Sequence, residues 1–142
     1  MYVKSILDEK GRNVVTGGTQ LTVRQSAVYL NENHIGAIVI VDRNDRIAGI
    51  LTERDIVAAI AKSGAECLDK PISSIMWGNV HRCDEDTTVD QLMQLMSGQR
   101  ARHVPVEKEG RLVGIISIGD VVKAHIRSIE REAEEIKAYI AS

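Results

Sequence analysis

Two short segments place a hydroxyl residue three positions before an aspartate. They are residues 52–55 (Thr-Glu-Arg-Asp) and residues 117–120 (Ser-Ile-Gly-Asp), and each follows an apolar run and begins a helical pattern. This spacing is typical of a helix cap, in which hydroxyl and acid satisfy backbone N–H groups. It also suits a sugar site, because a carboxylate at a helix N-terminus can accept hydrogen bonds from vicinal ribose hydroxyls, with Thr52 or Ser117 assisting Asp55 or Asp120. Since capping and ribose binding are compatible, the motif alone does not decide between them.

Basic residues and glycines lie close to both motifs. Arg102 and His103 directly precede an apolar run, and Arg54 falls in the first turn of the helix that begins at Thr52. A guanidinium makes bidentate contacts to phosphate, so these three residues are candidate phosphate ligands, although a solvated charged surface is the usual alternative. Gly49 and Gly114 precede the motifs, where their small size would permit the close approach of a ligand.

The two motifs occupy equivalent places in a chain that repeats itself. With an offset of 66, Gly36–Ile40 aligns with Arg102–Val106, and after the loss of one residue Arg46–Thr52 aligns with Arg111–Ser117. Each copy predicts a short extended piece, an amphipathic helix, two apolar strands joined by a turn, and a second helix. A unit of this size exposes an apolar face, so two copies are expected to pack against each other.

We therefore predict an α/β (α+β) fold with two tandem β-α-β-β-α repeats packed as one module and a long C-terminal helix. The predicted divisions are a lead-in helix at 1–12, the first repeat at 13–65, the second at 66–124 and a helical extension at 125–142. Within the repeats, the pattern predicts extended pieces at Val14–Thr16 and Val80–Arg82, and first helices at Thr22–Glu32 and Thr88–Gln99.

The C-terminal helix carries an apolar stripe. Its members recur at alternating steps of four and three residues, the spacing of a coiled-coil seam. They are Val122, Ile126, Ile129, Ala133, Ile136 and Ile140. The stripe either packs on its own module or joins two copies, and its length beyond the second repeat favours a homodimer.

Composition narrows the class of protein. A net charge of −2 and the absence of Phe argue against a nucleic-acid partner, because neither a basic surface nor a stacking platform is available. No apolar run suits a membrane span, and the charged N-terminus does not resemble a signal peptide. Cys67 and Cys83 lack metal-type spacing and suit free thiols in a reducing compartment, so a cytoplasmic protein is expected.

The repeated pattern matches a known family. Copy one contains Gly-Ala-Ile-Val-Ile-Val-Asp from residue 36 and Ile-Ala-Gly-Ile-Leu-Thr-Glu-Arg-Asp from residue 47. Copy two contains Arg-His-Val-Pro-Val from residue 102 and Leu-Val-Gly-Ile-Ile-Ser-Ile-Gly-Asp from residue 112. This sequence resembles the CBS (cystathionine β-synthase) domain over nearly the whole chain except the tail helix, and single-module proteins of the family look especially close.

The resemblance implies a regulatory sensor that binds up to two adenosyl ligands in a cleft between paired repeats. AMP is the first candidate, with ADP, ATP, NAD(H) and S-adenosylmethionine as others. By position, the resemblance assigns ribose contacts to Thr52, Asp55, Ser117 and Asp120. It assigns phosphate contacts to Arg54, Arg102 and His103, and an adenine environment to Val15, Ile38, His81, Val104 and Pro105. It implies no catalytic residue and no metal, a homodimer through the repeat faces and the tail helix, and an effector protein that the sequence does not identify.

Three alternatives remain open on the sequence alone. The first alternative is an enzyme, but the sequence shows no Ser/His/Asp or Cys/His set at a suitable spacing. His81 and Cys83 share a strand face, but two ligands are too few for a structural zinc site. A protein-interaction scaffold that binds no ligand, with the tail helix recruiting a partner, is also compatible with these residues.

Overall fold

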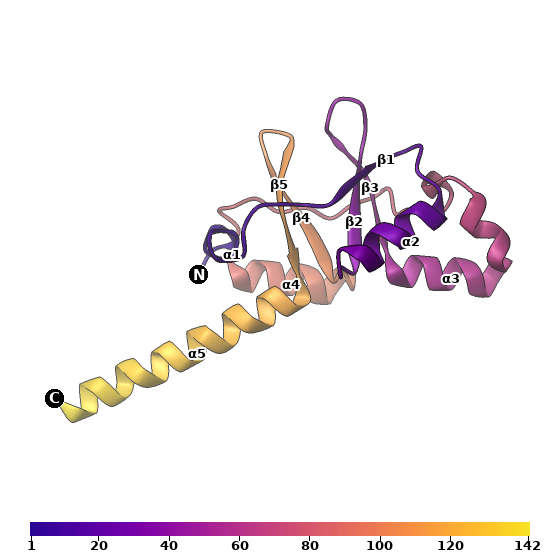
Figure 1. The fold of residues 1–142 in the computed structure, drawn as a ribbon. Helices are drawn as coiled ribbons and strands as arrows, with labels where there is room; N and C mark the ends of the chain where they lie inside the picture. Colours follow the sequence, from indigo (N-terminus) through magenta and orange to yellow (C-terminus); the bar gives the residue numbers. More distant parts are fainter. The chain divides into compact units, whose positions relative to one another are not determined.

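The computed structural model describes all 142 residues, and Figure 1 shows its helices and strands. The chain forms two compact units, each built from separate stretches of sequence. One unit contains Asn13–His81 and Lys108–Val113, and it holds the first repeat. The other contains Met1–Arg12, Arg82–Glu107 and Gly114–Ser142, and it holds most of the second repeat together with the C-terminal helix.

The first repeat contains a three-stranded sheet followed by a helix. β1 (Thr16–Gly18) pairs in parallel with β2 (Ala37–Val41), which pairs antiparallel with β3 (Ile47–Thr52). α2 (Val23–Glu32) connects β1 to β2, and α3 (Glu53–Ser63) follows β3. β2 is buried on both faces, as its unbroken apolar run predicts. The buried core of this unit consists of Val23, Leu30, Ile38, Ile40, Leu51, Ile56 and Ile72.

The second repeat has the same order of helices and a smaller sheet. Its elements are α4 (Val89–Gln99), β4 (His103–Lys108), β5 (Arg111–Ser117) and α5 (Ile118–Ala141). The extended piece predicted at Val80–Arg82 is not a strand, because only one bridge, between Cys83 and Val106, joins this segment to β4. The carboxylate of Asp84 instead accepts a hydrogen bond from the Asp86 N–H at 2.9 Å. Such a local turn competes with ladder pairing and ends the extended segment at once.

The segment before the first repeat packs on the second repeat, and the segment before the second repeat packs on the first. The first segment holds α1 (Val3–Lys10), and its backbone bonds to the start of α4 through Val3 N–H to the Thr87 carbonyl at 2.8 Å. The second holds two short 3₁₀ helices, Ala65–Asp69 and Ile72–Ser74, and bonds to the start of α2. There the Ile72 N–H donates to the Leu21 carbonyl at 2.8 Å. Both segments therefore lie against the equivalent edge of a repeat.

The C-terminal helix α5 is long and continuous, as predicted. Its first turns bury Val121 and Ala124 within their own unit, and Arg127 forms an ion pair with Glu9 of α1. From residue 129 onward every side chain is exposed. Neither α5 nor any other helix combines the length and apolarity needed to cross a membrane. The predicted α/β class with two repeats and a long C-terminal helix is confirmed.

Candidate functional site

Four helices of this chain begin with the same type of cap. In each, the hydroxyl of the N-cap residue accepts from the backbone of the third helical residue, whose side chain bonds back to the N-cap N–H. The pairs are Thr22 with Gln25, Thr88 with Gln91, Thr52 with Asp55, and Ser117 with Asp120. A neutral Gln closes the box on α2 and α4, so capping does not require a charge. The charged carboxylate occurs on α3 and α5, which follow the strand pair of each repeat.

The first acid lies at the N-terminus of α3, which we call the α3 site. Asp55 Oδ2 accepts from the Thr52 N–H at 2.8 Å and from the Thr52 hydroxyl at 3.0 Å, and the Asp55 N–H donates to that hydroxyl at 3.3 Å. Asp55 is half-buried and forms no ion pair. Its second oxygen, Oδ1, accepts no hydrogen bond from the chain, so it remains available to a donor from outside.

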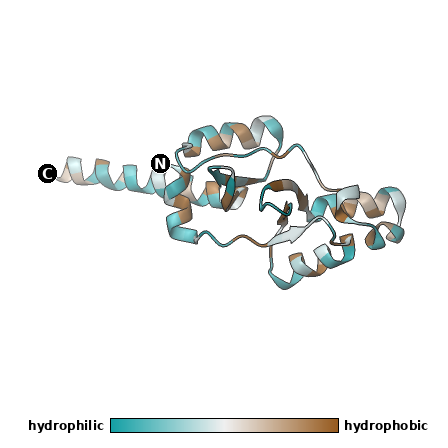
Figure 2. Ribbon diagram, turned by 90° about the horizontal axis from the view of Figure 1, so that it is seen from above, coloured by the Kyte–Doolittle hydropathy of each residue, from teal (hydrophilic) through white to brown (hydrophobic).

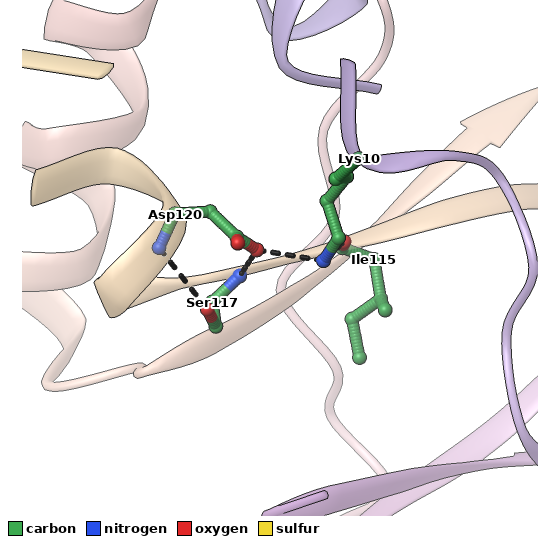
Figure 3. Close-up of polar contacts among 4 residues, drawn as sticks. All are labelled: Lys10, Ile115, Ser117 and Asp120. Carbon is green, nitrogen blue, oxygen red and sulfur yellow. Dashed lines mark hydrogen bonds and ion pairs between the residues drawn. The ribbon is translucent and has the colours of Figure 1, made fainter. Parts of the chain in front are cut away.

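The second acid lies at the N-terminus of α5, which we call the α5 site, and it has a cation beside it (Figure 3). Asp120 Oδ2 accepts from the Ser117 N–H at 2.8 Å and from Lys10 Nζ at 2.7 Å. Lys10 Nζ also donates to the Ile115 carbonyl at 2.9 Å. The last residue of α1 is thereby held against both β5 and α5. An ammonium group has three donors, so one N–H of Lys10 is left over at this site.

The charge state of Asp120 follows from these contacts. Burial disfavours the carboxylate and is the largest single influence on it. The hydrogen bonds from Lys10 and Ser117, together with the positive charge of Lys10, outweigh burial, so the pKa of Asp120 lies below its ordinary value of 3.8. Asp120 is therefore ionised at neutral pH and can accept hydrogen bonds from hydroxyl donors.

Lys10 is a site residue that the sequence pattern did not identify. A signal for it does exist in the repeat alignment. Residues 8–12 separate Leu7 from Asn13, whereas only residues 77–78 separate the equivalent Met76 from Asn79. The longer connection in the first segment extends α1 far enough to bring Lys10 to the α5 site.

The two glycines before the motifs have a packing role. A Cβ atom at Gly49 would lie 2.6 Å from Sδ of Met76, and one at Gly114 would lie 2.6 Å from Cδ2 of Leu7. Such separations are too short for any side chain, so both positions require glycine or a local shift. The space that we expected to permit the approach of a ligand is filled by the chain itself.

The basic candidates lie beside the helix N-termini in their own units. The Arg102 carbonyl accepts from the Ile118 N–H at 2.8 Å, which fixes the backbone of Arg102 next to the first turn of α5. His103 begins β4 and is half-buried, whereas the side chain of Arg102 is exposed. In the first repeat the equivalent bond runs from the Glu53 N–H to the Gly36 carbonyl at 3.1 Å, and Arg54 is the candidate that this unit itself supplies next to the α3 site.

The residues predicted around the adenine divide between the two units. Ile38 on β2 is fully buried opposite Leu51 of β3, and Val15 directly precedes β1. In the second repeat, Val104 and Pro105 on β4 are buried. His81 is half-buried and ends the sequence stretch of the first unit. Ile38 and Val104 are completely buried, backbone and side chain alike, so neither residue has a surface exposed to a ligand in this structure.

A charged cavity borders the α5 site, between α1 and α5. It has a volume of about 180 Å³, and its lining includes Lys10, Asp120, Lys123 and Arg127. No group of three or more His, Cys, Asp or Glu side chains is arranged to hold a metal ion. Burial, with a smaller effect of Asp84, raises the pKa of Cys83 to about 12, which disfavours the thiolate that a metal would need.

Comparisons with known proteins place this geometry in a family. The model of the CBS domain matches residues 3–62 and 72–127. The chain is 51% identical to the CBS-domain containing protein ATU1752 from Agrobacterium tumefaciens, whose crystal structure aligns with a TM-score of 0.86 over 88% of this chain and 99% of that one.

Two further solved structures contain ligands. The CBS domain pair of MJ0100, in complex with 5′-methylthioadenosine and S-adenosyl-L-methionine, is 29% identical, with a TM-score of 0.81 over 90% of this chain and 98% of that one. The CBS domain protein PAE2072 from Pyrobaculum aerophilum, complexed with AMP, is 28% identical, with a TM-score of 0.76 over 84% and 89%. The family match, the repeated motifs and the shared fold together show that this chain belongs to the CBS-domain family and contains two CBS repeats.

Proposed function

We propose that this protein is a regulatory module that binds an adenine nucleotide, with AMP as the first candidate, and passes the occupied state to an effector protein. The observation that carries the proposal is the repeated carboxylate at the N-termini of α3 and α5. Asp55 and Asp120 each use Oδ2 for the helix cap. The other oxygen of each carboxylate is left to accept a donor from a ligand.

A ribose fits this arrangement chemically. Its vicinal hydroxyls donate two hydrogen bonds, and a carboxylate fixed at a helix N-terminus can accept them without rearranging. Hydrogen bonds to a charged group contribute about 1.5–3 kcal/mol each, which is enough to discriminate a ribose from a deoxyribose. The Gln residues that cap α2 and α4 show that the chain does not need this charge to begin a helix.

Positive groups near the carboxylates favour an anionic ligand. At the α5 site one cavity is lined by three cations, Lys10, Lys123 and Arg127, and by two acids, Asp120 and Glu9, which pair with Lys10 and Arg127. Lys123 is therefore the lining cation without an acid partner there, and the backbone of Arg102 borders the first turn of the helix. At the α3 site, Arg54 is the nearest candidate in the sequence. A nucleotide phosphate next to the ribose would gain from these charges. Among the adenine ligands named above, AMP is the smallest that combines a ribose diol with a phosphate.

The ligands of related proteins support the adenosyl part of the proposal. MJ0100 binds 5′-methylthioadenosine and S-adenosyl-L-methionine, and PAE2072 binds AMP. All of these carry adenosine and differ at the 5′ position. We therefore assign the adenosine to the shared motif, with Val15, Ile38, His81, Val104 and Pro105 as the proposed adenine surroundings. The 5′ group is assigned to the basic residues Arg54, Arg102 and His103.

Calorimetric titration tests the proposal. Wild-type protein is expected to bind AMP and to bind 2′-deoxy-AMP at least tenfold more weakly, because one donor to the carboxylate is lost. Asp55→Asn and Asp120→Asn should each weaken AMP binding at one site by tenfold or more. Asn keeps the oxygen that caps the helix, but its NH₂ group cannot accept from a hydroxyl.

A matched control separates capping from ligand binding. Thr88→Ala removes the hydroxyl that caps α4 and should lower the unfolding temperature, because such caps contribute about 1 kcal/mol, while leaving AMP affinity unchanged. If both Asp→Asn variants bind AMP as the wild type does, the acids act only as caps and the ribose assignment is wrong. If AMP, ATP, NADH and S-adenosylmethionine all fail to bind the wild type, the ligand-independent scaffold replaces the sensor.

The proposal includes no catalysed reaction. CBS-domain pairs are typically regulatory, and the site offers acceptors and cations without an activated nucleophile. Homodimerisation through the repeat faces and the C-terminal helix is a further part of the proposal.

A further inference from the structure

We propose that α5 joins copies of this chain in a parallel coiled coil. The seam is the α5 stripe, defined as Val122, Ile126, Ile129, Ala133, Ile136 and Ile140. This inference does not depend on nucleotide binding. It identifies the partner of the surface as a second copy of the same chain and fixes the direction in which the two helices run.

The α5 stripe faces away from its own unit. Val121 and Ala124 are buried on one side of the helix, whereas Ile126 and Ile129 are 49% and 54% exposed. Ile136 and Ile140 are 60% and 77% exposed. The residues of the stripe lie roughly opposite Val121 and Ala124 around a helix of 3.6 residues per turn. The stripe therefore does not pack on its own unit, which was the alternative that the sequence left open.

The stripe is long enough for a partner of the same kind. From Val122 to Ile140 it spans about 27 Å at 1.5 Å per residue. Neither Gly nor Pro interrupts the helix after Gly119. In Figure 2, hydrophobic positions recur between hydrophilic ones along α5. An apolar face of this length and spacing is typical of a helix that a second helix covers.

The charges beside the stripe favour a parallel pair. In a parallel coiled coil, the residue directly before Ile126 or Ala133 lies beside the seam and faces the residue five positions further along the other helix. This places Glu132 opposite Lys137 of the other copy and His125 opposite Glu130, so opposite charges or a hydrogen-bonding pair meet at each contact. Each contact occurs twice across the symmetry axis.

The antiparallel alternative brings like charges together. With the stripes fully overlapped, Glu130 would face Glu130 of the other copy, and Glu132 would face Glu132. Lys123 would face Lys137. Like charges at flanking positions destabilise an association. The same residues therefore support one orientation and oppose the other, and this charge pattern is what assigns a second copy to the surface.

Sedimentation velocity over a range of concentrations tests the seam on the full-length chain. Wild type is expected to associate reversibly, and the mass of the complex gives the number of helices. Ile129→Glu combined with Ile136→Glu should weaken association by at least a hundredfold, because both charges would enter the seam. Ala138→Glu adds the same charge outside the stripe and should leave association unchanged. Both Ile residues are exposed, so thermal unfolding at low concentration should match that of the wild type and exclude misfolding.

One charge reversal tests the direction. Glu132→Lys places two like-charged contacts in a parallel pair and should weaken association about fivefold, and Lys137→Glu in the same chain should restore it. In an antiparallel pair, Glu132→Lys would exchange one like-charge contact for another and change little. A wild type that stays monomeric, or a mass unaffected by the double Glu variant, overturns the proposal and assigns the stripe to a different protein. An unaltered association of Glu132→Lys overturns the parallel orientation.

Discussion

The α3 and α5 sites share the same cap but differ in what surrounds the acid. Asp55 bonds only to Thr52, whereas Asp120 is also held by Lys10, which reaches it from α1. The difference arises outside the repeat, in the segments that complete each unit. A duplicated motif can therefore keep its local hydrogen bonds while a neighbouring segment changes its charge environment. In this chain the ionised carboxylate of Asp120 forms an ion pair with Lys10, whereas Asp55 forms no ion pair.

The two completing segments also differ in how they pack. Leu7 lies over Gly114 and is fully buried, while Met76 lies over Gly49 and is half-buried. A thioether chain adapts to its surroundings more readily than a branched aliphatic one. We therefore expect the α1 segment to be the more rigidly fixed of the two, and it is the one that carries a cation to the site.

The largest effect that would test this comparison comes from removing the two packing side chains. Leu7→Ala is expected to reduce the free energy of unfolding by about 2–5 kcal/mol, because a fully buried side chain leaves a cavity. Met76→Ala should cost less, since part of its surface is already in water. Urea unfolding followed by circular dichroism measures both.

Leu7→Met is the control, because it nearly conserves volume and should cost less than about 1.5 kcal/mol. Equal losses for Leu7→Ala and Met76→Ala would show that the two segments are equally fixed and would remove the distinction.

A smaller effect is expected from the ion pair at the α5 site. Lys10→Met removes the contact to Asp120 and the hydrogen bond to the Ile115 carbonyl, and should lower stability by roughly 1 kcal/mol because the pair is only partly shielded from water. Arg24→Met breaks the more exposed pair with Asp69 in the other unit and should have almost no effect. Thermal unfolding of both variants at the same ionic strength compares them. Similar losses in the two variants would mean that Lys10 is an ordinary surface residue.

The smallest effect is a shift in titration. Because the folded-state pKa of Asp120 lies below 3.8, its ionisation stabilises the fold above that pH, and this contribution is lost as the pH falls through the lower folded-state pKa. Lys10→Met removes a hydrogen bond and a positive charge that both lower this pKa, so the pKa of Asp120 should rise in the variant. Carboxyl ¹³C NMR from pH 2 to 6 measures it. An unchanged titration of Asp120 would show that Lys10 does not hold this carboxylate in solution.

Much of the fold followed from the sequence because its signals are local. The apolar run Ala37–Val41 predicted a strand covered on both faces, and the structure confirms it. The four-and-three spacing after Val122 predicted the long helix for the same reason. The strand predicted at Val80–Arg82 was wrong: these residues form no bridge, and the one bridge of the segment lies at Cys83, directly before the turn made by Asp84. The repeat boundaries, the ligand-site residues and a cytoplasmic location stay predictions.

The sequence by itself determined the two repeats and the two capped helices that begin with an acid, because each helix cap depends on residues only a few positions apart. Only the tertiary structure decided that α1 packs on the second repeat, that Leu7 fills the space above Gly114, and that Lys10 forms an ion pair with Asp120. Lys10 and Asp120 are 110 positions apart, and the longer connection after Leu7 does not by itself say which residue Lys10 meets. Their contact exists because burial of the apolar face of α1 holds the end of that helix next to the start of α5.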